Sequence, residues 1–162
     1  MQYPGFQQAS TTLAPRRSFG GGSFIGKYLE AQNAVYPQAL GELRAGRKRT
    51  HWMWFIFPQI AGLGRTATAR HYAIEDIDQA EAYLGHPILA ARLRECTQAV
   101  LLHGPGGVAP RSLSEIFGSP DDLKFHSSMT LFHRADPDDE LFTRALRAFF
   151  RGREDQATVD LL

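Results

Sequence analysis

Residues 87–101, PILAARLRECTQAVL, decide the fold class of this chain. Their apolar side chains recur every three or four positions, at Leu89, Leu93, Cys96, Val100 and Leu101. This period places side chains on one face of an α-helix. A proline in the first turn and the glycine-rich run at residues 104–107 are typical of a helix start and of a helix end. We therefore predict a long amphipathic helix with a buried face, in which Cys96 serves as a small buried hydrophobe.

Similar start and stop signals occur on both sides of this stretch. Residues that favour the helix N-cap precede further apolar residues at helical spacing. They are Ser23, Thr66, Asp76 or Asp78, Ser112 or Ser114, Ser119 before Pro120, the acidic group at residues 136–140, and Asp155. Pro37 is interpreted as the first-turn proline of a second helix, separate from the helix that begins at Ser23.

The aromatic run at residues 52–57, WMWFIF, does not reveal its own period. A short continuous apolar run fits a buried strand and a buried helical turn equally well. Pro58 should end it in either case. Because alternating runs are few and helix caps are many, we predict an all-α, compact, single-domain multi-helix fold. Residues 1–22 are predicted to be a disordered N-terminal tail, and residues 23–162 one helical domain.

Composition narrows the class of protein. Of the 162 residues, 43% are hydrophobic and 22% charged, which is ordinary for a globular domain. The formal net charge of +1 makes nucleic-acid binding an unlikely general function, because such binding needs a basic excess or a concentrated basic patch. No apolar run approaches the length of a membrane span, and the first residues lack a signal-peptide core. We expect a cytoplasmic protein with no membrane partner.

One run of residues is far from ordinary composition. It is Gly46-Arg47-Lys48-Arg49-Thr50-His51-Trp52-Met53-Trp54-Phe55-Ile56-Phe57-Pro58-Gln59. Five further motifs follow it in order: Gly62-Leu63-Gly64, Tyr72-Ala73-Ile74, His86-Pro87 with Arg92-Leu93, Ile116-Phe117-Gly118 and Ser127-Ser128-Met129-Thr130-Leu131-Phe132. Together they resemble the bacterial family known as domain of unknown function eighteen-ten, some members of which are mislabelled calpastatin. The resemblance covers roughly residues 24–162. It implies a compact, mainly α-helical domain, and it brings no established activity and no catalytic residues.

The first candidate site lies within residues 47–59. Arg47, Lys48 and His51 stand beside Trp52 and Trp54, and Gln59 follows. Basic groups next to aromatic faces can hold a phosphorylated or nucleotide-like ligand by charge-assisted bonds and stacking. A structural interpretation has strong support as well, because cations stabilise a helix C-terminus and tryptophans in an apolar run usually belong to a core.

The second candidate site is the polar set Lys124, His126, Ser127, Ser128 and Thr130, which interrupts an apolar helical pattern. A serine next to His126 could act as a nucleophile only with a third orienting group and an oxyanion hole. Small hydroxyls also allow close helix packing and bond back to carbonyl groups. The six histidines lack metal-ligand spacing, so neither a metal nor a cofactor is predicted.

These observations leave the function open between two classes. Our leading hypothesis is a helical binding module for a protein partner or a small anionic ligand. The alternative is a small enzyme acting on a phosphorylated or nucleotide-derived substrate, with His51 as acid or base.

Overall fold

The computed structural model describes residues 21–162 and, within them, the side chains of residues 24–162. In this part of the chain the secondary structure consists of α-helices, with a single isolated parallel bridge between Ile60 and Ile74. The helices are α1 (Gly21–Arg44), α2 (Met53–Ile56), α3 (Ala67–His71), α4 (Ile77–Gly85), α5 (Pro87–Leu101), α6 (Leu113–Phe117), α7 (Asp121–Ala135), α8 (Glu140–Phe150) and α9 (Gln156–Asp160). The predicted all-α, compact fold is confirmed.

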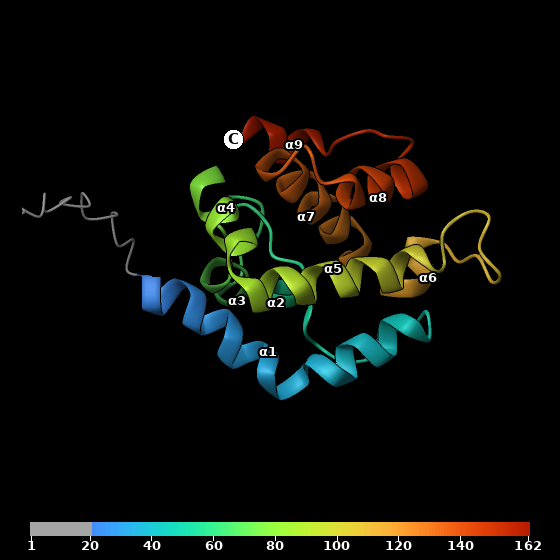
Figure 1. Ribbon diagram of the computed structural model, residues 1–162, viewed down its shortest axis with the longest axis horizontal. Coiled ribbons are helices and arrows are strands. Elements are labelled where there is room, and N and C mark those ends of the chain that lie inside the picture. The colour runs from blue at the N-terminus through green and yellow to red at the C-terminus, as the bar shows by residue number, and fades with distance from the viewer. Residues whose placement is uncertain (1–20) are drawn as a thin grey trace, which may run out of the picture.

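Helices α5 and α7 organise the domain (Figure 1). The first packs against α1, α2, α4 and α8, whereas α7 packs against α4, α6, α8 and α9. The stripe predicted from the sequence is the face that α5 buries, with Leu89, Leu93, Cys96 and Val100 at most 1% exposed. Burial raises the pKa of the Cys96 thiol to about 12, so this cysteine is protonated and inert.

Aromatic side chains fill the space between the helices. The largest of those that are fully buried are Trp52, Tyr28, Tyr83, Phe57, Phe125, Phe132 and Phe142. Several meet edge to face, as Phe57 does with Phe125 at a centroid distance of 5.2 Å. Such pairs add a stabilisation of about 0.5–1.5 kcal/mol to that of the buried area. Most of the aromatic run of residues 52–57 is therefore core, with Trp54 and Phe55 partly buried, and its middle forms the short helix α2.

Most predicted helix starts are confirmed at the level of individual hydrogen bonds. Thr66, Asp76 and Asp155 accept backbone N–H bonds at the N-caps of α3, α4 and α9. Ser112 and Glu115 form a reciprocal capping box at the start of α6. Asp139 caps α8, and the His86 ring caps α5 ahead of the first-turn proline. These contacts join residues at most three positions apart, which is why the sequence alone could predict them.

The prediction of a helix boundary at Pro37 was wrong. Helix α1 continues through this proline, and its axis visibly changes direction along its length (Figure 1). Proline removes one helical hydrogen bond and crowds the preceding turn, which kinks a helix without always ending it. Both halves bury side chains in the common core, Tyr28 before the proline and Leu43 after it. Packing thus outweighs the local signal.

Two further predictions need correction or delimitation. Ser119 does not cap α7, because the N-cap residue of this helix is Pro120 and no side chain bonds to it as a cap. Within the first turn, Asp122 Oδ1 accepts the N–H of Leu123. The predicted tail, residues 1–22, lies outside the described residues except for Gly21 and Gly22, which begin α1. Within residues 21–162 no helix has the length and apolar character that crossing a membrane requires.

Candidate functional site

Glu42 organises the unusual loop that follows α1. Its side chain is buried, and its carboxylate accepts hydrogen bonds from the amides of Arg49 and Thr50, the Thr50 hydroxyl and the indole Nε1 of Trp52. Burial acts to raise the pKa of this carboxyl, but the four hydrogen bonds outweigh it and lower the pKa below its usual value. The four hydrogen bonds to this charged carboxylate fix the backbone path of residues 45–52.

The two candidate segments meet at one carboxylate. Lys48 Nζ lies 3.0 Å from Asp121, and Lys124 Nζ lies 3.1 Å from the other oxygen of the same carboxylate. Burial opposes ionisation of Asp121, yet the hydrogen bonds from both lysines hold its pKa below the usual range. The backbone N–H of Lys48 also donates to the carbonyl of Ile116 at 2.6 Å. This cluster ties the loop to α6 and to the first turn of α7.

The two tryptophans have different environments. Trp52 is fully buried, with Lys48 Nζ 5.2 Å from a ring centroid. Trp54 is half-buried, and Lys124 Nζ lies 5.2 Å from its ring. Trp54 and Gln59 line a cavity of about 10 Å³, together with Tyr72 and residues around Gly64. That volume is at the limit for a single water molecule, so this cavity does not receive a metabolite.

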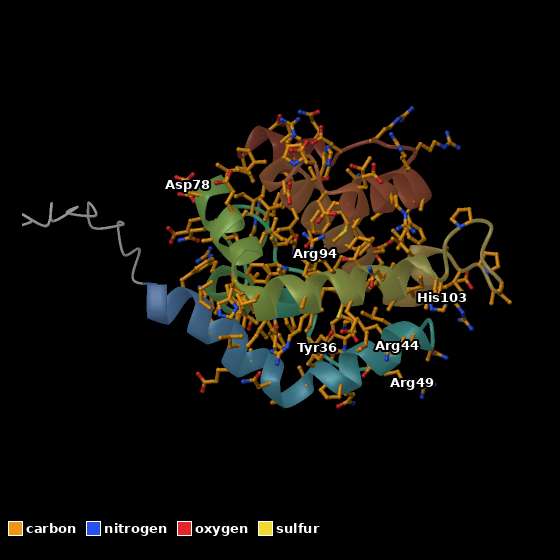
Figure 2. The ribbon with its side chains drawn as sticks, viewed as in Figure 1. Tyr36, Arg44, Arg49, Asp78, Arg94 and His103 are labelled. Carbon is orange, nitrogen blue, oxygen red and sulfur yellow. The ribbon has the colours of Figure 1, made fainter. Side chains whose placement is uncertain are left out.

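Arg47, Arg49 and His51 are the residues of this loop whose ionisable side chains are exposed. Figure 2 shows Arg49 at the outer edge of the molecule, beyond the C-terminal half of α1. His51 makes no hydrogen bond with another described residue, and it lines neither the cavity beside Trp54 nor the larger pockets between the described helices. Among the described residues, none orients the ring as a general acid or base requires.

The hydroxyl groups of α7 hold the C-terminal segment in place. Ser127 Oγ donates to Asp155 at 2.9 Å, and Thr130 Oγ1 accepts the backbone N–H of Asp155 at 2.8 Å. Thr130 also donates to the carbonyl of His126. Ser128 is fully buried, and its hydroxyl has no hydrogen-bond partner among the described residues. Ser127 and Thr130 thus position the residue that caps α9, and they do not converge with His51.

The described residues contain no group of three or more His, Cys, Asp or Glu side chains able to hold a metal ion. The histidine nearest to the core, His103, is 9% exposed, and its Nε2 lies 2.8 Å from the carbonyl of Leu43. Its ring thus satisfies a carbonyl near the end of α1 (Figure 2).

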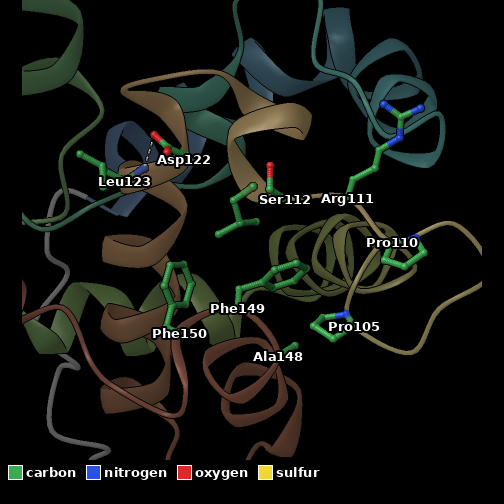
Figure 3. Close-up of a pocket in the computed structure, with 10 residues that line it drawn as sticks. Pro105, Pro110, Arg111, Ser112, Asp122, Leu123, Ala148, Phe149 and Phe150 are labelled. Atoms are coloured by element: carbon green, nitrogen blue, oxygen red, sulfur yellow. Dashed lines mark hydrogen bonds between the residues drawn. The ribbon is translucent and has the colours of Figure 1, made fainter.

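An open pocket of about 680 Å³ lies between the first turn of α7, the C-terminal end of α8 and the loop that joins α5 to α6. It is lined by Pro105, Pro110, Arg111, Ser112, Leu113, Asp122, Leu123, Ala148, Phe149 and Phe150. We call it the Phe149 pocket (Figure 3). Most of its lining is apolar, and the Arg111 side chain extends away from the two phenylalanines. A pocket of this size and character suits an apolar side chain of a partner.

Phe149 and Phe150 form the aromatic wall of the Phe149 pocket, and residues of α7 support both rings. The rings of Phe150 and His126 stack at 3.7 Å with an interplanar angle of 8°, and His126 Nε2 lies 2.8 Å from the carbonyl of Arg153. The buried Phe125 touches both wall residues, with centroid distances of 6.2 Å to Phe149 and 6.3 Å to Phe150. Contacts within the domain therefore hold this wall in place.

Two hollows continue this pocket along α8. The first, of about 350 Å³, shares Pro105 and Ala148 with the Phe149 pocket and adds Arg144 and Arg147. The second, of about 310 Å³, shares Leu101 and Arg144 with the first and adds Gln98 and Leu102. We call them the arginine hollows. Because each shares lining residues with the next, the three depressions form one continuous surface.

Sequence reasoning missed this surface. It treated residues 104–107 only as the end of the helix at residues 87–101, and it placed no site residue in the helix that follows residues 136–140. The available signal was the pair Phe149-Phe150 directly before the end of a helix, where one face cannot bury both neighbouring rings. Both rings are indeed only half-buried.

The comparisons with known proteins agree on the family. The chain matches the family model described as "Protein of unknown function (DUF1810)" over residues 23–162. It is also similar to the conserved hypothetical protein Rv1873 from Mycobacterium tuberculosis, known from a crystal structure at 1.38 Å. The identity is 48%, the match covers 86% of this chain and 96% of that chain, and the TM-score is 0.81. No curated protein matches. The resemblance found in residues 46–59 and the motifs after them is confirmed, and the chain belongs to the DUF1810 family of proteins of unknown function.

Proposed function

We propose that this chain is a helical binding module that receives a segment of a partner protein in the Phe149 pocket. The supporting observation is an open apolar pocket of about 680 Å³ at a surface that also exposes large hydrophobic side chains. Six such side chains are exposed in the described residues. Leu102 and Leu123, each 63% exposed, line the continuous surface, and Val108 lies in the loop beside it. Clustered exposed apolar groups mark interaction sites, whereas scattered ones do not.

The geometry suits a peptide anchor. Binding energy at protein interfaces concentrates in a few aromatic or aliphatic side chains that fill preformed pockets. Phe150 is held by His126, and Phe149 by Phe125, so little ordering of the wall is needed when a partner binds. The mostly apolar lining offers a small anion few hydrogen-bond donors, so the pocket favours an apolar side chain.

Two hypotheses from the sequence remain predictions. A small anionic ligand near Lys48 and Lys124 would have to compete with Asp121, which already pairs with both lysines. An enzyme that uses His51 would need a substrate to supply the orientation that the described neighbours do not give. The protein-partner function is the one that a cavity of adequate size supports.

The test is a selection of peptides against the whole chain. Phage would display random peptides of about twelve residues, which span about 40 Å when extended. We expect enriched peptides that carry an aromatic or branched aliphatic residue and that bind more weakly, by about tenfold or more, to a Leu123→Glu variant. Ile88→Glu is the matched control, because Ile88 is an exposed apolar residue of α5 that does not line the surface. Peptides that bind Leu123→Glu as well as they bind the native chain would overturn the proposal.

A further inference from the structure

The surface beyond the Phe149 pocket differs from the pocket in charge. Arg144 and Arg147 line the arginine hollows, and no acidic side chain lines them. The acidic residue of the Phe149 pocket, Asp122, uses one oxygen to accept the N–H of Leu123. The continuous surface is therefore apolar at one end and cationic at the other.

Arg144 and Arg147 form no ion pair with another described residue, in contrast to several other arginines. Arg44 pairs with Glu95, Arg94 with Asp139, and Arg134 with Glu154. Arg147 lies in the last turn of α8, where a cation also stabilises the helix dipole. Arg144 lies earlier in the helix and has no such role. Its guanidinium is available to a ligand on the exposed face.

From this asymmetry, and resting on the proposed function, we infer that the partner segment is acidic: an apolar anchor enters the Phe149 pocket while carboxylates of the same segment pair with Arg144 and Arg147. The planar guanidinium group binds carboxylates through two parallel hydrogen bonds, which gives geometric specificity as well as attraction.

The spacing along α8 predicts where the carboxylates stand. Ala148, shared by the pocket and the first hollow, is four residues from Arg144, or about 6 Å along the helix axis. An extended peptide covers that distance in about two residues, and the reach of the arginine side chain adds one or two more. Acidic residues should therefore stand about two to four positions from the anchor, on one side of it.

A charge reversal tests this inference in the same peptide selection. With the native chain we expect Asp and Glu to be enriched on one side of the anchor. With the double variant Arg144→Glu/Arg147→Glu we expect Lys and Arg at those positions. The matched control is Arg65→Glu/Arg70→Glu, which changes the net charge equally at two exposed arginines next to and within α3, neither of which lines the surface. This control should retain the acidic preference.

A solution measurement adds a second readout. Dye-labelled copies of the selected acidic peptides should lose about tenfold in affinity for the Arg144→Glu/Arg147→Glu variant and keep their affinity for the α3 control. Their affinity for the native chain should also fall severalfold as salt rises from about 0.05 to 0.5 M, because screening shortens the range of charge attraction.

The outcomes separate this inference from the proposed function. Peptides that depend on Leu123 but show no acidic preference would overturn the acidic partner and leave the binding module standing. Peptides that ignore Leu123 would overturn both. Two further results would show that the occupant is not an acidic peptide. A concentration-dependent dimer that Leu123→Glu abolishes would identify a second copy of the chain. An oligonucleotide that displaces the peptides and whose binding depends on Arg144 would identify a nucleic acid.

Discussion

The loop at residues 45–52 and the Phe149 pocket differ in opposite ways: the loop has an unusual sequence but few groups free to bind a ligand, whereas the pocket has an ordinary sequence and an open surface. The loop has a rare composition, yet several of its polar groups are bonded internally to Glu42 and Asp121. The pocket is built from ordinary prolines, leucines and phenylalanines, yet it is open and apolar. Unusual residues can thus mark a demanding internal connection, while a binding surface can arise from common residues in a rare arrangement.

The largest effect on stability is expected from a substitution of Glu42. Replacing it by Gln removes the charge and places amide hydrogens against donors, so we expect a loss of about 3–4 kcal/mol in the free energy of unfolding. Chemical denaturation followed by circular dichroism measures it. Glu30→Gln is the matched control, because Glu30 lies exposed on the same helix and bonds to no other described side chain. If both variants lose the same small amount, Glu42 does not fasten the loop.

The same residue should give the fold a specific acid sensitivity. The folded-state pKa of Glu42 lies below the value of about 4.3 for an unfolded glutamate. Its contribution is therefore complete above that value and is lost as the pH falls through the folded-state pKa. We expect the stability gap between the native chain and Glu42→Gln to narrow as the pH is lowered from about 6 to about 3. Denaturation at a series of pH values measures the gap, and a constant gap would contradict the assignment.

Two ion pairs of α7, one at Asp121 and one at Arg134, differ in burial and can be compared directly. Asp121→Asn leaves Lys48 and Lys124 facing each other without a counter-ion in a largely buried setting, and should cost about 1–3 kcal/mol. Glu154→Gln breaks the pair with Arg134, which is half-exposed, and should cost less than about 1 kcal/mol. Urea denaturation of both variants, at low and high salt, measures the difference. Equal losses would mean that burial does not distinguish the two pairs.

The smallest effect on stability is expected in the pocket itself. Leu123 is 63% exposed, so Leu123→Glu should change the free energy of unfolding by no more than about 0.5 kcal/mol. The same variant should remove most of the peptide binding. Unchanged stability in denaturation, together with lost peptide binding in fluorescence polarisation, would show that Leu123 serves binding and not the fold, in contrast to Glu42. A large loss of stability would show instead that Leu123 supports the fold.

The sequence predicted the fold better than the site, for a physical reason. Helix caps and amphipathic stripes are local: Asp76 meets Gln79, and Ser112 meets Glu115. Pro37 predicted a helix boundary that α1 does not have, because packing of its two halves outweighs one missing hydrogen bond. The role of Glu42 depends on a loop that turns back to it, and Lys48 meets a carboxylate of α7. The continuous surface needs α5, α6, α7, α8 and the loop after α5 in their final places, and no local pattern describes such an arrangement.

The burial of Cys96 makes this protein convenient for labelling chemistry. Because its single cysteine is fully buried and its thiol has a pKa raised to about 12, a maleimide reagent would find no reactive thiolate in the native chain. A cysteine introduced at Val108, at the exposed loop beside the Phe149 pocket, would therefore be modified alone. A dye attached there would stand next to the proposed peptide path and could report its occupancy in real time.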